Sequence, residues 1–170
     1  MAFHPTGAFG NGQRPVLTRL HVDEPTVVKI AKTDRNARMP TKGSANAAGW
    51  DLYCLEETVV NFRTSVKIRT GLRVAIPEGF EGQVRARSSL GSKGLILPHS
   101  IGTIDSDYRG ELFVLMTWIG QGESYKVKSG ERIAQLVIAP IPNIQFSEVE
   151  VGGLGETERG EGGFGSTGRF

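Results

Sequence analysis

The chain has 170 residues and a formal net charge of +2, so it is long enough for one domain and only mildly basic. That charge permits a polyanionic ligand but does not call for nucleic acid, and no nucleic-acid partner is expected. A single cysteine, Cys54, excludes an internal disulfide, and the longest apolar run, Leu112 to Ile119, is too short to cross a membrane.

The chain begins without the apolar core of a signal peptide, so we expect a cytoplasmic protein, or one in the host cell interior if a virus encodes it. Glycine and proline are frequent at the start, and we assign residues 1–25 to a partly ordered N-terminal leader. One short helix is predicted from Ser88 to about Lys93. Apolar runs between Gly, Pro or Ser clusters predict strands at residues 72–76, 83–87, 95–97, 111–119, 125–128, 132–139 and 144–151. This pattern predicts an all-β, jelly-roll-like barrel.

The segment Arg87-Ser-Ser-Leu-Gly-Ser-Lys93 directly follows a predicted strand. Ser88 is a candidate N-cap for the short helix, which would leave backbone N–H groups free, and Arg87 adds a positive charge beside them. A strand that ends in such a turn is suited to bind an anion. Serine caps are also common in helices without a ligand, so a purely structural role is the alternative.

Two carboxylates flank a serine in Gly102-Thr-Ile-Asp-Ser-Asp-Tyr-Arg-Gly-Glu111, at a bend between two strands. One of them, inside a pocket, could hold and deprotonate a water molecule, while the other faces solvent or pairs with Arg109. An Asp-rich turn with a surface ion pair is the alternative.

The segment Gly130-Glu-Arg-Ile-Ala-Gln-Leu136 predicts a strand that is buried on both faces, with Gln135 on the mainly apolar face. A buried amide without a partner costs about 1–3 kcal/mol. Gln135 is therefore either a structural hydrogen bonder or a ligand contact, and the sequence favours neither.

The C-terminal residues Arg159 to Phe170 include five glycines, so their backbone entropy is high and they build no core of their own. We predict a flexible arm that closes over a ligand with a flat ring and phosphates. Arg159 would contact phosphate oxygens, Phe164 would stack on the ring, and the backbone and hydroxyls near Ser166 would line an anion site. A disordered tail without a ligand is the alternative.

In this order, the segments resemble the trimeric dUTPase family, whose members hydrolyse dUTP to dUMP and pyrophosphate. The resemblance spans about residues 26–168 and implies a barrel at residues 26–158 and an arm at residues 159–170 that closes over an active site. The five matching motifs are Ala48-Gly-Trp-Asp-Leu52, Arg87-Ser-Ser-Leu-Gly91, Gly102-Thr-Ile-Asp-Ser-Asp-Tyr-Arg-Gly110, Gly130-Glu-Arg-Ile-Ala-Gln-Leu136 and Arg159-Gly-Glu-Gly-Gly-Phe-Gly-Ser-Thr-Gly168.

The resemblance also implies a role for each matching residue. Asp105 would orient and activate the water that attacks the α-phosphorus, and Gln135 would help to hold that water or the α-phosphate. Tyr108 would pack under the deoxyribose and leave no room for a 2′-hydroxyl. The other substrate contacts would be Arg87, Ser88 and Ser89 for the phosphate chain, His99, Thr103, Ile104 and Phe113 for the uracil edge, and Arg159, Phe164, Gly165, Ser166 and Thr167 in the arm. His99 stands where the family commonly has Asn, and Ser89 stands where Gly is common.

The implied cofactor is Mg²⁺, chelated mostly by the triphosphate and reached by Asp51 through water. The implied assembly is a homotrimer whose sites borrow residues from three chains. The implied role is to limit uracil incorporation into DNA and to supply dUMP for thymidylate synthesis. Two other functions fit the same fold: a dCTP deaminase, which lacks the closing arm, and a non-catalytic regulator that binds dUTP without hydrolysing it.

Overall fold

A computed structural model describes residues 25–163 and residue 166 of this chain. Strands dominate this part of the chain, and the predicted all-β, jelly-roll-like fold is confirmed. The strands are β1 Lys29–Lys32, β2 Thr41–Lys42, β3 Trp50–Tyr53, β4 Thr58–Asn61, β5 Ser65–Ala75, β6 Phe80–Ala86, β7 Leu95–Ile96, β8 Gly102–Ile104, β9 Glu111–Trp118, β10 Ser124–Val127 and β11 Arg132–Pro140. The helical elements are α1 Ser88–Gly91 and the 3-10 turn η1 Val151–Leu154. Among the described residues, no helix has the length and apolar character needed to span a membrane.

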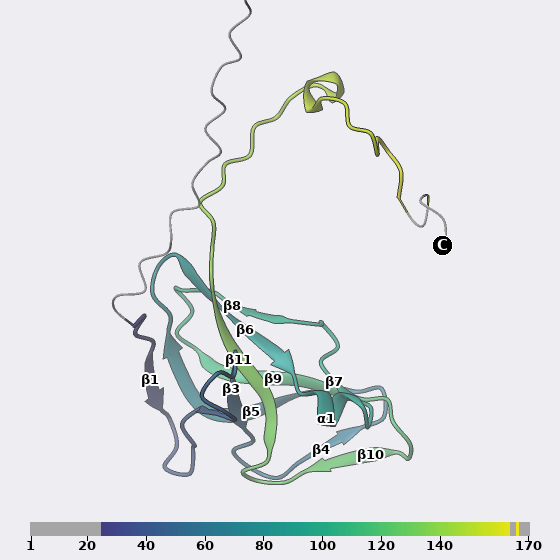
Figure 1. The fold of residues 1–170 in the computed structure, drawn as a ribbon. Helices are drawn as coiled ribbons and strands as arrows, with labels where there is room; N and C mark the ends of the chain where they lie inside the picture. The colour runs from purple at the N-terminus through teal and green to yellow at the C-terminus, as the bar shows by residue number, and fades with distance from the viewer. Residues whose placement is uncertain (1–24, 164–165, 167–170) are drawn as a thin grey trace, which may run out of the picture.

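The strands form three antiparallel sheets (Figure 1). One sheet has the order β2-β3-β11-β6-β8, a second has the order β1-β5-β9-β7, and the pair β10-β4 makes a third. β4 contacts both β5 and β9, so the small pair extends the second sheet at one end of the body. The order of the first sheet brings β3 and β6 to either side of β11, so the motifs on β3 and β11 lie beside the motif that directly follows β6.

The two larger sheets enclose one apolar core. In β5, Ile68 and Val74 are buried whereas Lys67 and Arg73 point outward, which is the alternation expected of a strand with one buried face. Removing apolar side chains from water is the main force that holds two such sheets together. The largest fully buried side chains are Leu52, Ile68, Leu72, Leu95, Leu112, Met116 and Ile133.

A bulge in β5 positions the start of β9. The register between the two strands shifts between Arg69 and Arg73, and Gly71 within this stretch has a φ of +67°, which favours glycine. The hydroxyl of the buried Thr70 donates a hydrogen bond to the Leu112 carbonyl over 2.5 Å. This hydrogen bond joins the β5 bulge to the second residue of β9 and so fixes where β9 begins.

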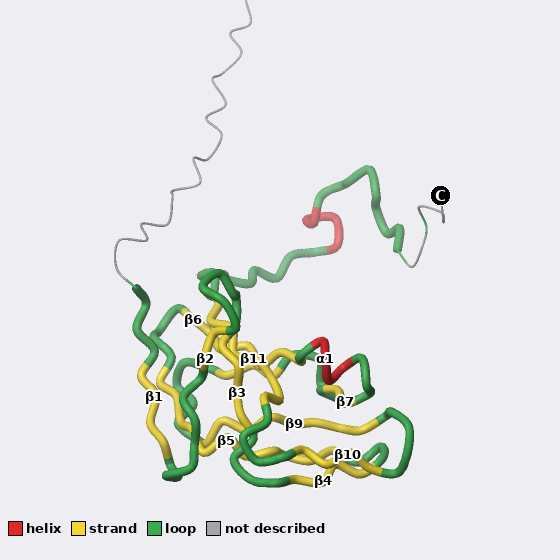
Figure 2. Tube along the Cα trace, turned by 60° about the horizontal axis from the view of Figure 1, so that its bottom comes forward, coloured by secondary structure: helices red, strands yellow, loops and turns green. Residues whose placement is uncertain are grey.

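The prediction of a strand at residues 144–151 is wrong. After Pro140 no residue from 141 to 150 belongs to a strand, and this segment leaves the body in two views (Figures 1 and 2). Ile144 and Phe146 are exposed, the latter by 92%. A strand needs a partner for its backbone groups, and the segment lies away from both edges of this chain's sheets.

The predicted short helix is present, and the single cysteine forms no disulfide. α1 begins at Ser88 as predicted but ends at Gly91, about one half-turn before Lys93. Cys54 is buried and free, and its thiol donates to the Glu56 carbonyl over 2.8 Å. Burial raises the pKa of this thiol above its ordinary value of 9.0.

Candidate active site

Six of the predicted site residues line a single hollow of about 300 Å³ beside β8 and β9. They come from the loop before β8, from β8, from the turn that follows it and from β9. We call this the β8–β9 hollow. The predicted residues in it are His99, Thr103, Ile104, Asp105, Tyr108 and Phe113, and the other lining residues are Lys67, Val84, Gly102, Glu111 and Leu115. Lys67 and Glu111 also line the hollow, although the sequence did not predict them as site residues.

Two glycines allow the aromatic rings of the hollow to lie against the backbone. A Cβ at Gly102 would lie 2.9 Å from Nε2 of His99, so the imidazole packs directly over the glycine. A Cβ at Gly110 would overlap the hydroxyl and ring of Tyr108. The Tyr108 hydroxyl donates to the Glu111 carbonyl over 2.9 Å, so the ring is held at both its face and its tip.

The turn between β8 and β9 is closed by its own arginine. The guanidinium of Arg109 donates to the carbonyls of Ser106, over 2.6 Å, and Tyr108, over 2.8 Å, so its hydrogen bonds go to the backbone of the turn. The exposed Asp105 borders both the β8–β9 hollow and a second hollow that is also lined by Glu78 and Arg109. Its carboxylate is therefore accessible to water, as a group that activates a water must be.

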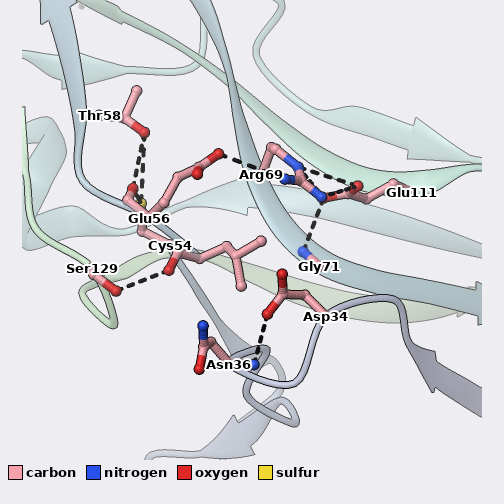
Figure 3. Close-up of polar contacts among 10 residues, drawn as sticks. Asp34, Asn36, Cys54, Glu56, Thr58, Arg69, Gly71, Glu111 and Ser129 are labelled. Carbon is pink, nitrogen blue, oxygen red and sulfur yellow. Dashed lines mark hydrogen bonds and ion pairs between the residues drawn. The ribbon is translucent and has the colours of Figure 1, made fainter.

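Glu111 fixes the end of this turn. Its carboxylate accepts from Nε of Arg69 over 3.2 Å, from Nη2 of Arg69 over 3.1 Å and from the backbone N–H of Gly71 over 3.0 Å (Figure 3). The hydrogen bonds and the negative charge of Glu111 raise the pKa of the Arg69 guanidinium. A charge-assisted pair with two parallel bonds has a defined direction, so the first residue of β9 is held against the β5 bulge.

A second group of predicted residues gathers around Asp51 in the middle of the first sheet. Asp51, on β3, is 2% exposed, and its two oxygens receive three donors. Oδ1 lies 3.2 Å from Nε of Arg87 and 3.3 Å from Nε2 of Gln135, and Oδ2 lies 3.1 Å from Nη1 of Arg132. We call these four residues the Asp51 cluster. It gives the amide of Gln135 the hydrogen-bond partner that its partial burial requires.

Two exposed serines stand beside the Asp51 cluster at the start of α1. The backbone of Arg87 is extended, with φ −88° and ψ 132°, and the helix begins one residue later. The prediction that Ser88 caps this helix is wrong, because Arg87 occupies the N-cap position and makes no side-chain cap hydrogen bond. Ser88 lies inside the first turn instead, and both Ser88 and Ser89 are exposed residues.

One chain does not bring the hollow and the Asp51 cluster together. β8 pairs with β6 so that Ile104 lies opposite Gly82, whereas Arg87 follows the far end of β6. Six residues of strand separate position 81 from position 87, which corresponds to about 20 Å. Figure 1 shows α1 and the turn after β8 at opposite ends of β6. Asp105 and Arg87 of the same chain therefore lie too far apart to contact one phosphate group.

Residues 159–163, the described start of the glycine-rich arm, also lie away from the body of their own chain (Figures 1 and 2). The exposed Arg159 donates through Nε to the carbonyl of Gly162 over 2.7 Å, so its described contact is local. The backbone N–H of Ser166 donates to the carbonyl of Gly163 over 3.0 Å. The other predicted arm residues, Phe164, Gly165 and Thr167, and the leader residues 1–24 lie outside the described residues.

Comparison with known proteins gives a consistent result. A protein-family model described as dUTPase matches residues 35–168. The chain is 45% identical over 134 residues to the deoxyuridine 5′-triphosphate nucleotidohydrolase of Zymomonas mobilis, which covers 78% of this chain and 90% of that protein. It is 43% identical over 145 residues to the protein of the same name from Wolbachia pipientis, with 84% and 94% covered.

Solved structures give the same match at the level of the fold. The dUTPase of Staphylococcus bacteriophage 80alpha with dUpNHpp is 31% identical and has a TM-score of 0.77, covering 85% of this chain and 99% of that one. A variant dUTPase from phage phi11 of S. aureus, described for its coordination of a structural Mg(II) ion, is 26% identical, with a TM-score of 0.67 and coverage of 74% and 97%.

Proposed function

The chain belongs to the dUTPase family, and we propose that its active site joins the β8–β9 hollow of one copy to the Asp51 cluster of a second copy and the C-terminal arm of a third. The reaction is the hydrolysis of dUTP to dUMP and pyrophosphate. The family model and the relatives confirm the resemblance to the dUTPases that the motifs indicated.

The observation that carries the assignment of the site is the gathering of six predicted site residues in one hollow. A volume of about 300 Å³ lies at the small end of ligand sites, which suits a pyrimidine and its sugar better than a larger ligand. The ring of Tyr108 packs on Gly110 and its hydroxyl bonds to the Glu111 carbonyl, so the ring fills the space that a 2′-hydroxyl would need. A close-fitting hollow likewise rejects the 5-methyl group of thymine by steric clash.

Asp105 is the group assigned to the attacking water. Its exposed carboxylate orients a water molecule toward the α-phosphorus and accepts the proton as the new P–O bond forms. The bond to the bridging oxygen breaks, and pyrophosphate leaves. Gln135 of a neighbouring copy supplies a second hydrogen bond to the water or to the α-phosphate, and this positioning contributes much of the acceleration.

The phosphate chain requires positive charge and donors. Arg87 provides a planar guanidinium, and the exposed Ser88 and Ser89 that follow it provide hydroxyl donors, a set of groups suited to phosphate oxygens. Arg159 and Ser166 in the arm of a third copy add further donors when the arm closes. Phe164, Gly165 and Thr167 are assigned to the same arm, with Phe164 covering the base.

Mg²⁺ fits this site as a water-bridged ion. Asp51 uses three of the roughly four acceptor positions of its carboxylate for Arg87, Arg132 and Gln135, which leaves Oδ2 one position for a water. The described residues offer no group of three or more His, Cys, Asp or Glu side chains that could cage a metal ion. The ion would therefore take most of its ligands from the triphosphate, whose negative charge it would partly neutralise.

A homotrimer is supported by the apolar side chains on the segment that leaves the body. Ile144, Phe146, Val151 and Leu154 are all exposed in the single chain. Exposed apolar side chains gathered on one segment mark a surface that associates with another protein surface. Docking this segment on a neighbouring copy would bury them and carry the arm toward that copy's site.

We propose the division of the chain that the sequence predicted: a leader at residues 1–25, a barrel at residues 26–158 and an arm at residues 159–170. The sheets end at Pro140, so residues 141–158 connect the barrel to the arm rather than adding to its core.

Pyrophosphate release measured with dUTP, UTP, dTTP and dCTP tests the proposal. We expect kcat/KM for each of the other three to be lower than for dUTP by about tenfold or more, because each adds a group or reverses a hydrogen bond. Ammonia release from dCTP would instead identify a deaminase. Tight dUTP binding without hydrolysis would identify a regulator.

A further inference from the structure

Arg132 makes a contact that the roles assigned so far do not use. Its Nη1 lies 3.1 Å from Oδ2 of Asp51, and its side chain is half exposed. Arg87 lies on the other oxygen, with Nε 3.2 Å from Oδ1, and its side chain is 20% exposed. One buried carboxylate thus has two arginine partners, although one would neutralise its charge.

The two arginines are also joined to each other. Nη1 of Arg87 donates to the backbone carbonyl of Arg132 over 3.0 Å, so Arg87 is held at both the carboxylate and the backbone of β11. Gln135 uses the same oxygen of Asp51 as Arg87 does. The oxygen that Arg132 occupies is the one not used by the proposed substrate-contacting residues.

Arg87 uses Nε for Asp51 and Nη1 for the Arg132 carbonyl, so a phosphate that takes the Nε edge of the guanidinium displaces it from Asp51. When it turns toward the triphosphate, the carboxylate of Asp51 loses one cation. A buried carboxylate that loses its last positive partner is strongly disfavoured, because it has already given up its hydration. With Arg132 in place, Asp51 remains paired throughout.

The geometry points to Arg132 as a positioning residue that keeps Asp51 paired and so frees Arg87 to bind the phosphate chain. This inference rests on the proposed function, since it takes the role of Arg87 from it. Arg132 acts through Asp51 and needs no contact with the nucleotide. Its removal should therefore weaken nucleotide binding through Arg87.

The test compares Arg132→Met with wild type in the assembled enzyme. We expect KM for dUTP and Kd for dUpNHpp to rise by about 10- to 100-fold, the range for one charge-assisted contact, with a smaller change in kcat. Arg132→Lys should recover part of the affinity because it restores the charge. Arg85→Met is the matched control, since Arg85 is an exposed arginine on the neighbouring strand that bonds to Gln83 and should leave both constants unchanged.

A coupled variant separates this role from the others. In an Asp51→Asn background, Arg132→Met should have no further effect on Kd for dUpNHpp, because the carboxylate through which Arg132 acts is gone. A second loss in that background would mean that Arg132 contacts the nucleotide itself. A purely structural role would lower the melting temperature of Arg132→Met and leave Kd per folded site unchanged.

The outcomes also separate this inference from the proposed function. If wild type hydrolyses dUTP and Arg132→Met has an unchanged KM and Kd, the positioning role of Arg132 is wrong and the proposed function stands. If wild type neither hydrolyses dUTP nor binds dUpNHpp, both are wrong. Should Arg132→Met fail to fold, Arg132→Gln, which keeps a donor but no charge, takes its place with the same expected rise in KM.

Discussion

Replacing Gly110 with alanine tests whether the Tyr108 ring governs the choice of sugar. A Cβ at this position would overlap the Tyr108 hydroxyl and ring, and Gly110 is not among the residues with positive φ, so the effect is steric. The ring must leave its place, and the hydrogen bond to the Glu111 carbonyl is lost with it. The side of the β8–β9 hollow that faces the deoxyribose then opens.

The expected loss of stability follows from these contacts. A hydrogen bond of this kind contributes about 1 kcal/mol net, and overpacking costs about 1–3 kcal/mol when the surroundings cannot move. Tyr108 is partly exposed and can swing into solvent, so we expect the free energy of unfolding to fall by about 1–2 kcal/mol, toward the low end of that range. The preference for dUTP over UTP in kcat/KM should fall by about tenfold or more.

Urea unfolding and kcat/KM for dUTP and UTP measure the two effects. Gly43→Ala is the control, because a Cβ at Gly43 meets nothing within 4 Å. If Gly110→Ala unfolds like Gly43→Ala and keeps the wild-type preference for dUTP, Tyr108 does not form the sugar contact and this reasoning is refuted.

Three further changes test other parts of the molecule. Asp105→Asn should abolish pyrophosphate release but keep the Kd for dUpNHpp within a few-fold of wild type; unchanged turnover would remove Asp105 from the mechanism. Deleting residues 159–170 should cripple dUTP turnover without lowering the melting temperature, since the described contacts of Arg159 are local, and a fully active deletion would show that the arm has no role. Burial raises the pKa of the Cys54 thiol, so the unfolded chain loses this proton first as pH rises past 9.0, and the stability of wild type relative to Cys54→Ala should fall above that pH. A pH-independent difference between the two proteins would contradict the burial of the thiol.

Much of the barrel could be predicted because its strands carry their own signal. β9 and β11 combine β-branched and apolar residues between turn residues, so their runs are visible locally. β3 was not predicted because Asp51 and Leu52 are both buried, which removes the alternation, and a charged residue interrupts the run. The segment 144–151 has the composition of a strand, but composition does not provide a neighbour to pair with.

The candidate site likewise has a part that could be predicted from the sequence and a part that could not. The third motif supplied four of the predicted residues in the β8–β9 hollow, because they lie close together in the sequence and the hairpin brings them to one surface. The contact between Asp51 and Arg132 could not be predicted, since 81 positions separate the two residues and only the pairing of β3 with β11 joins them. A register of this kind depends on the whole sheet and leaves no local pattern.

Mixed assemblies of two inactive variants test most directly whether copies share the active site. Asp105→Asn and Gln135→Ala should each be inactive when expressed alone. The test co-expresses the two variant chains in equal amounts. If Asp105 of one copy works with Gln135 of another, random assembly restores about a quarter of the sites, and with them about a quarter of wild-type dUTP turnover. Turnover no higher in the mixture than in either variant alone would contradict the shared site.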